Sequence, residues 1–363
     1  MKIAFINTVN LEENGISTFI LNNSYILSQW GIKITVIVPN EVKNELRIAL
    51  RLKNIKLVEL PMRNIYPQNY FFKLMRILKK EKFDVAHVNG NSTTMAVELL
   101  AAYFAGIKLR IAHSHNTTTD HKKINKLLRP LFNIVTNGRI ACNVAAGKWL
   151  FPHDKFLVIK NGINLSHFKF NKQKRNKYRD KLNLTKDSIL LGHVGRFNQQ
   201  KNQQFLINLI TKLDSKYHLL LIGSGMNYHK LSAKVSKDPQ LNKRIFFTGP
   251  VEDTAGWLNA MDIFLLPSLY EGQPYTLVEA TATGLNAIVS DSISRENDIA
   301  NNIIFETIIQ NKNWIEVIRK QDFNKDRGDL SSKYINVLRM VGFDTIENAK
   351  ILLNFYKQKL LKL

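Results

Sequence analysis

The sequence contains almost no cysteine. Its 363 residues include one, Cys142, so neither a disulfide framework nor a cysteine-based zinc site can form within the chain. No apolar run approaches the roughly 18 residues that a membrane span needs; the stretch from Leu99 to Ile107 is among the longest and is too short. The run from Met1 to Asn7 is short and strand-like, without the apolar stretch and cleavage site of a signal peptide. We therefore expect a cytoplasmic protein.

Acidic residues are also scarce. Asp and Glu total 29 against 52 Lys and Arg, which gives a formal net charge of +23, spread over both halves of the chain. Two segments, 73–82 and 121–132, combine basic residues with apolar ones at helical spacing. Each is either an ordinary surface helix or a face attracted to an anionic membrane surface or to phosphates. Zinc-finger spacing, RNA-binding aromatic signatures and repeated modules are absent, so we expect no nucleic-acid partner.

What the sequence does contain is a regular alternation of strand and helix patterns. Runs such as 2–7, 33–38 and 85–88 alternate with helical patterns such as 16–29, 69–80 and 122–135. The rhythm repeats from residue 188 onward, for example with a strand run at 217–222. This alternation predicts an α/β protein with parallel sheets covered on both faces, and the length suggests two such domains. We expect the polar stretch 163–178 to be the linker. A last helix is predicted by Asp344 as N-cap, by Glu347 three residues on, and by an apolar stripe of Ile346, Ala349, Leu353, Tyr356 and Leu360.

Functional residues are expected at strand-to-helix junctions, because open α/β sheets bind ligands beyond the carboxyl ends of their strands. After the first strand, Gly15 opens a helix whose free N–H groups suit an anion, although an ordinary turn explains a lone glycine. Arg196 closes a later strand and Lys201 precedes the next helix, so this pair suits a diphosphate, with solvated surface charge as the alternative. Gly223-Ser-Gly225 is either a tight turn or a nucleotide contact.

The most informative junction runs from Pro267 to Gly284. Glu271 lies in the loop after a strand, and Glu279 lies eight residues further on, in the following helix. Carboxylates accept hydrogen bonds from sugar hydroxyls, and the N–H groups of residues 275–277 could hold a phosphate. No His or Asp stands at helical spacing from Glu279, so we expect no metal site.

Together these segments resemble the retaining nucleotide-sugar glycosyltransferases of the GT-B fold, in the large family-4 group, and most of all the bacterial exopolysaccharide and capsule enzymes. The resemblance rests on the Glu271/Glu279 pair, on the segment 194–203 (VGRFNQQKNQ) and on the run 267–272 (PSLYEG). It extends over essentially the whole chain. Many members carry Gly-Gly where this chain has Asn14-Gly15, and the chain has no Asp-x-Asp triad.

The resemblance implies two Rossmann-like, doubly wound domains that face a central cleft. Residues 1–168 would form the acceptor-side domain, residues 169–343 would hold the donor, and the final helix, 344–363, would pack back on the first domain. The implied activity moves a sugar from a nucleotide-sugar donor to a lipid-linked or saccharide acceptor in exopolysaccharide or cell-surface polysaccharide synthesis. The donor most common in the resembled family is a UDP-sugar, so we expect a UDP-sugar here. Transfer would retain the anomeric configuration and need no metal or other cofactor.

The basic segments 73–82 and 121–132, together with a lipid-linked acceptor, lead us to expect a cytoplasmic enzyme that is peripheral on the inner leaflet of the cell membrane. Three alternatives share the fold: a non-catalytic sugar-nucleotide-binding protein, an epimerase that releases free sugar, and a glycogen- or sucrose-type synthase. A transfer assay separates them, because a binding protein turns over no donor and an epimerase needs no acceptor.

The resemblance also assigns roles residue by residue. Arg196 and Lys201 would bind the diphosphate and stabilise the leaving charge, and Glu271 would contact the hydroxyls of the transferred sugar. His115 would lie beside the reacting carbon; His113 competes for that role, but His115 lies further past the strand end. The remaining donor contacts would be Glu279 at the ribose, Gly249 and Val251 near the base, and Gly15, Gly272, Thr276 and Leu277 near the phosphates.

Overall fold

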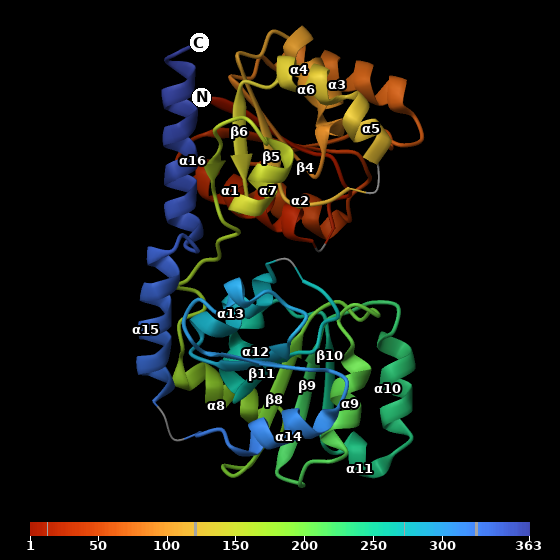
Figure 1. Cartoon of the computed structure of the whole chain (residues 1–363), viewed down its shortest axis with the longest axis vertical. Coiled ribbons are helices and arrows are strands. Elements are labelled where there is room, and N and C mark those ends of the chain that lie inside the picture. Colours follow the sequence, from red (N-terminus) through yellow and green to blue (C-terminus); the bar gives the residue numbers. More distant parts are fainter. Residues whose placement is uncertain (13, 120–121, 272, 324–325) are drawn as a thin grey trace. The chain divides into compact units, whose positions relative to one another are not determined.

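The computed structural model divides the chain into two compact units (Figure 1). Unit 1 comprises Met1–Gly162 and Asp344–Leu363, and unit 2 comprises Ile163–Phe343. The structure describes residues 1–12, 14–119, 122–271, 273–323 and 326–363. Unit 2 begins at Ile163, before the expected boundary at residue 168, because the Ile163 N–H donates to the Phe343 carbonyl and the Ile163 side chain packs in the core of unit 2.

Unit 1 is built on a seven-stranded sheet of order β3-β2-β1-β4-β5-β6-β7 in which every neighbouring pair is parallel. Its apolar strand residues alternate between two cores, one under α1, α2 and α16 and the other under α3, α4 and α6. The strands are β1 (Lys2–Asn7), β2 (Lys33–Val38), β3 (Lys56–Glu59), β4 (Val85–Gly90), β5 (Leu109–Ser114), β6 (Gly138–Ala141) and β7 (Leu157–Val158). The helices are α1 (Gly15–Gln29), α2 (Asn44–Leu52), α3 (Pro67–Glu81), η1 (Thr93–Met95), α4 (Ala96–Phe104), α5 (Lys122–Leu127), α6 (Arg129–Val135), α7 (Val144–Leu150) and α16 (Thr345–Leu360).

The last helix, α16, is capped as its sequence predicts. The Asp344 carboxylate accepts the Ile346 N–H at 2.9 Å, and the helix buries Ala349, Leu352 and Tyr356 in the core that α1 also covers. In Figure 1 this helix, in dark blue, runs beside the red strands and helix of unit 1, although it is the last element of the chain. The buried face differs in part from the predicted stripe, since Ile346 is exposed.

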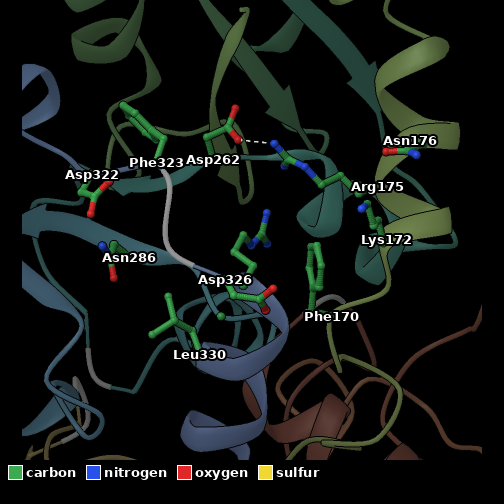
Figure 2. A pocket seen from close by; sticks show the side chains of 12 residues that line it. Phe170, Lys172, Arg175, Asn176, Asp262, Asn286, Asp322, Phe323, Asp326 and Leu330 are labelled. Atoms are coloured by element: carbon green, nitrogen blue, oxygen red, sulfur yellow. Dashed lines mark hydrogen bonds and ion pairs between the residues drawn. The ribbon is translucent and has the colours of Figure 1, made fainter. Parts of the chain in front are cut away.

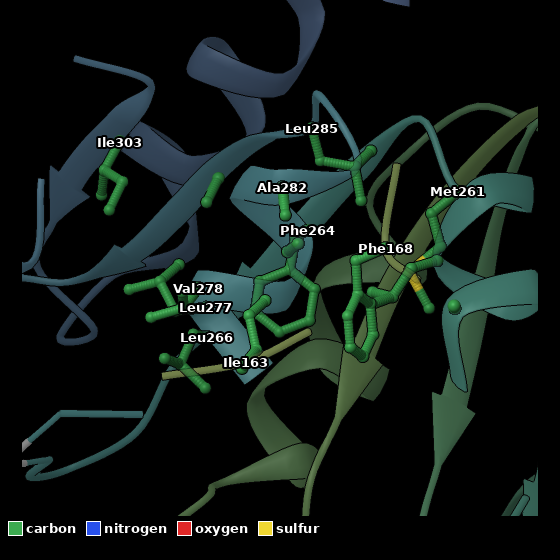
Figure 3. Close-up of a cluster of buried hydrophobic side chains, with 14 of the residues drawn as sticks. Ile163, Phe168, Met261, Phe264, Leu266, Leu277, Val278, Ala282, Leu285 and Ile303 are labelled. Atoms are coloured by element: carbon green, nitrogen blue, oxygen red, sulfur yellow. The ribbon is translucent and has the colours of Figure 1, made fainter. Parts of the chain in front are cut away.

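Unit 2 repeats the plan with a six-stranded parallel sheet of order β10-β9-β8-β11-β12-β13. One core lies under α9, α10 and α14; the other, drawn in Figure 3, lies under α8, α12, α13 and α15. The strands are β8 (Ile189–Val194), β9 (Tyr217–Ile222), β10 (Ile245–Gly249), β11 (Ile263–Leu266), β12 (Asn286–Ser290) and β13 (Ile303–Glu306). The helices are α8 (Lys172–Asp180), α9 (Gln203–Ile210), α10 (Tyr228–Ser236), α11 (Pro239–Asn242), α12 (Thr254–Ala260), α13 (Tyr275–Ala282), η2 (Arg295–Asn297), α14 (Asn311–Arg319) and α15 (Arg327–Met340).

Two local predictions were wrong. The stretch expected as a linker contains helix α8, which is part of unit 2 because Tyr178 packs edge-on against Trp257 and the buried Arg179 pairs with Asp262 at 3.0 Å. The single helix expected over residues 122–135 is two helices, α5 and α6, and a proline lies in the first turn of α6, where its missing N–H is tolerated.

A cavity of about 310 Å³ opens at the amino-terminal edge of the second sheet, where Asp262 precedes β11 and Asn286 begins β12 (Figure 2). Its floor is an arginine cluster that completes the end of α12. Arg175 and Arg327 both donate to the carbonyls of Asn259 and Met261, and Arg175 also pairs with Asp262 at 2.5 Å. These bonds satisfy carbonyls that a helix end leaves without partners. The cavity lies at the opposite edge from the predicted site residues of unit 2.

Candidate functional site

An ion pair joins two predicted residues that are far apart in the sequence. Lys201, between β8 and α9, donates from Nζ to Oε1 of Glu271, after β11, at 2.6 Å, and the two side chains are only 16% and 9% exposed. Such charge-assisted bonds are short and strong. The structure therefore brings together the cation and the carboxylate for which the sequence predicted roles at a donor diphosphate and sugar.

Backbone bonds hold the two loops in this arrangement. The Leu269 N–H donates to the Gln200 carbonyl at 2.8 Å, and Gln200 Nε2 donates to the Tyr270 carbonyl at 2.8 Å. The backbone of Lys201 is also held within its own loop, because its N–H donates to Asn198 Oδ1 at 2.9 Å. Gln200 and Asn198 are positioning residues that the sequence analysis missed, and only their place beyond a strand end could have indicated them.

Arg196 lies on the same loop but is not part of this pair. The residue is exposed, and no other described residue forms a hydrogen bond or ion pair with its guanidinium. Its carbonyl accepts a bond from Gln203 Nε2 at 3.0 Å, which fixes the backbone while the side chain extends into solvent. Arg196 therefore has all of its donors available for an anion.

The Gly-x-Gly turn after β9 is required by backbone packing. Gly223 and Gly225 have φ angles of +132° and +149°, and a Cβ at either would overlap the carbonyl oxygens of Gly195 and Phe197. The Phe197 N–H also donates to the Ser224 carbonyl at 2.8 Å. The two glycines thus let the β9 loop lie directly against the loop that carries Arg196.

The base-side residues adjoin this turn. Gly249 ends β10 with a φ of +70°, and its carbonyl accepts the Gly223 N–H at 3.0 Å. Val251, two residues further on, is partly buried against the core of unit 2. Both lie at the carboxyl edge of the sheet, where the family resemblance implied the base of a nucleotide. Gly272 lies outside the described residues.

Helix α13 begins close to Glu271 and has an open start. Its N-cap is Pro274, which offers no side-chain acceptor, and its first turn carries no acidic residue. The Leu277 N–H already donates to the Pro274 carbonyl at 3.1 Å, whereas Thr276 Oγ1 is buried without a partner in the described part of the chain. The Leu277 amide, one of the predicted phosphate contacts, is therefore already bonded, whereas the Thr276 hydroxyl is available to a ligand.

Glu279 lies in the second turn of α13. It is partly buried, and its carboxylate forms no hydrogen bond or ion pair with any other described residue. Removal from water disfavours the charged form, so burial raises the pKa of this carboxyl to about 7. An unpaired carboxylate at this position is suited to accept hydrogen bonds from a hydroxyl-bearing ligand.

In unit 1, His115 stands one residue beyond β5. Asn89 Nδ2 donates to the His87 carbonyl at 3.2 Å, so Asn89 Oδ1 faces His115 Nε2, 3.0 Å away, and that nitrogen must carry the proton. Burial lowers the pKa of His115 to about 3, and its Nδ1 has no partner in the described residues. His115 is therefore a neutral imidazole with Nδ1 as an acceptor, whereas His113 is fully buried and bonded to His87.

Gly15 is the first residue of α1. The preceding Asn14 is the N-cap, and its side chain accepts the Ser17 N–H at 2.9 Å. One of the free donors at this helix start is thus already used, which is the consequence of having Asn where many members of the resembled family have Gly.

Comparison with known proteins decides the family. The model described as "Glycosyltransferase Family 4" matches residues 13–167, and that described as "Glycosyl transferases group 1" matches residues 188–315. EpsF of Bacillus subtilis, named as a glycosyltransferase, is 30% identical over 291 residues, which are 76% of this chain and 74% of that protein. The chain belongs to the family-4 glycosyltransferases.

Two further relatives of this glycosyltransferase are informative. The UDP-Gal:α-D-GlcNAc-diphosphoundecaprenol α-1,3-galactosyltransferase of Escherichia coli is 29% identical over 238 residues, 60% of each chain. The crystal structure of Anabaena HepE with UDP-glucose superposes with a TM-score of 0.78 at 17% identity, over 100% of both chains. This likeness establishes the GT-B fold for the glycosyltransferase.

The described residues of the glycosyltransferase lack two features. They include no helix that is both long and apolar enough to cross a membrane. They also include no group of three or more His, Cys, Asp or Glu side chains that could hold a metal ion.

Proposed function

We propose that this glycosyltransferase moves a sugar from a UDP-sugar to a lipid-linked or saccharide acceptor, with retention of configuration, in the synthesis of an exopolysaccharide or other cell-surface polysaccharide. The observation that carries the proposal is the Lys201–Glu271 pair, at 2.6 Å. It lies on the same sheet edge as Arg196, the open start of α13 and Glu279, whose carboxylate has no partner among the described residues. Two cations, two carboxylates and a helix start suit a diphosphate flanked by two hydroxyl-rich sugars.

In the proposed reaction, the bond between the sugar C1 and the diphosphate oxygen breaks as C1 bonds to the acceptor oxygen on the same face. The acceptor proton passes to the departing phosphate oxygen, so charges and atoms balance. Lys201 and Arg196 stabilise the negative charge of the departing diphosphate, and Glu271 orients the transferred sugar through its hydroxyls. We propose that these cations, rather than a metal ion, supply that stabilisation.

Glu279 and the β10 loop would complete the donor site. The Glu279 carboxylate accepts hydrogen bonds from the ribose hydroxyls, Thr276 binds a phosphate oxygen, and Gly249 and Val251 lie beside the base. In unit 1, the lone pair on His115 Nδ1 accepts a hydroxyl of the reacting sugar, and the start of α1 at Gly15 faces the donor phosphates. The neutral state of His115 supports a hydrogen-bonding role and speaks against a role as a proton donor.

Two comparisons support the choice of substrates. The E. coli relative is named for UDP-Gal as donor and for a diphosphoundecaprenol-linked sugar as acceptor, and the HepE structure contains UDP-glucose.

The surface of α5 supports contact with an anionic membrane on the cytoplasmic side. Ile124 and Leu127 are 48% and 78% exposed, next to Lys122, Lys123 and Lys126, and α5 buries none of its residues. By contrast, the other basic segment lies largely within α3, which buries Tyr70, Leu74 and Leu78 as an ordinary surface helix does. Exposed apolar groups beside lysines are typical of membrane-surface helices.

The test incubates the full chain with a panel of UDP-sugars and with lipid-linked or free saccharide acceptors, and measures UDP release and the anomeric configuration of the product. An α-linked product from an α-linked donor supports the proposal. UDP binding without turnover identifies a binding protein, release of free sugar without an acceptor identifies an epimerase, and inversion refutes retention. Lys201→Ala tests the site, with Lys212→Ala, an exposed lysine after α9, as the matched control.

A further inference from the structure

A chain of buried polar side chains crosses the core of unit 1. The Tyr356 hydroxyl, on α16, lies 2.5 Å from His87 Nδ1, and His87 Nε2 lies 3.0 Å from His113 Nδ1. The rings of His113 and His115 then lie against each other with centroids 4.0 Å apart, and Phe19 meets both rings at a steep angle. The last helix of the chain is thereby connected to the residue proposed at the reacting carbon.

The strand register explains why these groups meet. The four polar side chains lie on one face of the sheet, because successive side chains of a strand point to opposite faces and these residues are two apart. They are residues 87 and 89 on β4, and residues 113 and 115 at and just beyond the end of β5. This is the face covered by α1 and α16, which supply Phe19 and Tyr356. The polar chain therefore lies inside an otherwise apolar layer, where unsatisfied groups are costly.

The protonation of the chain follows from burial and from counting donors. Burial lowers the pKa of His87 and of His113 well below the ordinary value and raises that of Tyr356, so all three are neutral. A neutral imidazole has one N–H and one acceptor. If Tyr356 donates to His87 and His87 donates to His113, a single group, the N–H at His113 Nε2, lacks a partner among the described residues. If His113 instead donates to His87 and His87 donates to Tyr356, two groups lack partners there: His113 Nε2 and the Tyr356 O–H. The first arrangement is therefore favoured.

We propose that Tyr356 and His87 are positioning residues for His115. By donating in sequence, they keep His113 in one tautomer and one ring orientation, and the His113 ring is the surface on which His115 packs. Asn89 fixes the other side of His115 through Nε2. Together they hold His115 with its proton on Nε2 and its Nδ1 free to accept a hydroxyl. This inference rests on the proposed function, and it adds α16 to the elements that support the site.

The test is Tyr356→Phe, which removes one hydroxyl and leaves the ring packing intact. We expect kcat to fall roughly tenfold to a hundredfold, by analogy with the loss seen when the hydrogen-bonding partners of metal-ligating histidines are removed. The UDP dissociation constant should stay within about twofold, since the proposed donor contacts of unit 2 are untouched. Tyr334→Phe, which removes the hydroxyl of another buried tyrosine, on α15, is the matched control and should leave kcat unchanged.

A second readout needs no turnover. Nitrogen-15 NMR of labelled histidine reports the tautomer of each ring, and wild type should show neutral His115 with its proton on Nε2, and Tyr356→Phe should show mixed tautomers at His87 and His113. His87→Gln should lower kcat in the same way. An unchanged kcat with a lower melting temperature, or unchanged tautomers in Tyr356→Phe, overturns the proposal. If wild type transfers no sugar but has these tautomers, the proposed function fails and the positioning remains.

Discussion

Replacing Glu279 by glutamine should make the protein more stable and its donor binding weaker. The carboxyl has no partner among the described residues, and burial raises its pKa from 4.5 to about 7. Because the folded-state pKa is the higher one, the folded protein binds this proton more tightly than the unfolded chain does. Stability from this group is full below pH 4.5 and is lost as the pH rises through about 7.

The size of the effect follows from the shift. At about 1.4 kcal/mol per pKa unit, the shift is worth about 3 kcal/mol once the group is fully ionised, and about 2.5 kcal/mol of this develops between pH 5 and pH 8. These are upper limits, because the side chain keeps some contact with solvent. Glutamine cannot ionise, so Glu279→Gln should gain stability over wild type at pH 8 and little at pH 5.

Urea unfolding at the two pH values measures this difference. Glu316→Gln, on the exposed side of α14, is the control and should show no such difference. Equal stability of Glu279→Gln and wild type at pH 8 would mean that the carboxylate has a partner or solvent access that the structure does not show.

Donor binding should move in the opposite direction. If ribose hydroxyls donate to the Glu279 carboxylate, UDP binds the protein in which Glu279 is ionised. With a pKa of about 7, the ionised fraction of Glu279 rises from about a tenth at pH 6 to about nine tenths at pH 8. UDP affinity should then tighten roughly tenfold over this range in wild type, beyond any change seen in Glu279→Gln. The variant comparison removes the ionisation of UDP itself, whose terminal phosphate titrates near about pH 6. At pH 8 the variant should bind about tenfold to a hundredfold more weakly, and parallel titration curves for the two proteins would refute the ribose contact.

Five further outcomes are expected. Glu271→Ala should abolish transfer and Lys201→Ala should lower kcat by about a thousandfold or more, as for other cations that stabilise phosphoryl leaving charge; wild-type turnover by either would refute the site. EDTA should leave activity unchanged, and a loss restored by magnesium or manganese would refute metal-independent transfer. Arg63→Met should lower the free energy of unfolding in urea by about 3–5 kcal/mol, because the buried Glu98 carboxylate loses the guanidinium whose Nε lies 2.6 Å from it in wild type. A change near zero would show that Glu98 is neutral. Binding to anionic vesicles at low salt should be lost when Lys122, Lys123 and Lys126 are all changed to Glu, and unaltered binding would reduce α5 to a solvated helix.

The strand pattern was the most predictable feature of this fold. The bounds of β1, β2 and β9 agree with the runs seen in the sequence, because buried parallel strands are continuous apolar segments. Since their carboxyl ends meet at one edge, the sequence could also indicate that Lys201 and Glu271, 70 residues apart, belong to one site.

Helices with little buried apolar surface were missed. Helix α2 buries only Leu50, and α14 buries only Trp314 and Ile318. Both sequences are amphipathic, but each helix is short and offers few buried residues to mark it. Helix α8 was interpreted as a linker because it is highly polar; its attachment depends on Arg175 and Arg179, whose partners are the Asp262 carboxylate and carbonyls near the end of α12. Sequence periodicity carries no information about such bonds.

The hydrogen-bonded series of side chains behind His115 could not be predicted from the sequence either. Tyr356 and His87 are 269 residues apart, and an apolar stripe on a helix predicts a tyrosine ring in the core without predicting where its hydroxyl lies. Asn89 follows the general rule for strand ends, but only its bond to the His87 carbonyl shows which amide atom faces His115. These roles depend on which way a hydroxyl or an amide group points, and packing in the folded protein sets that direction.

The Lys201–Glu271 pair has a consequence for how a donor would enter. Both side chains are largely buried, and an unpaired buried charge is costly, so each stabilises the other while no ligand is bound. A diphosphate that attracts Lys201 would leave the Glu271 carboxylate needing new donors, which the hydroxyls of the transferred sugar can supply. UDP alone offers the phosphates without that sugar. Removing Glu271 should therefore weaken binding of the complete UDP-sugar more than binding of UDP, and the difference between the two affinities measures how much of the sugar's recognition depends on this carboxylate.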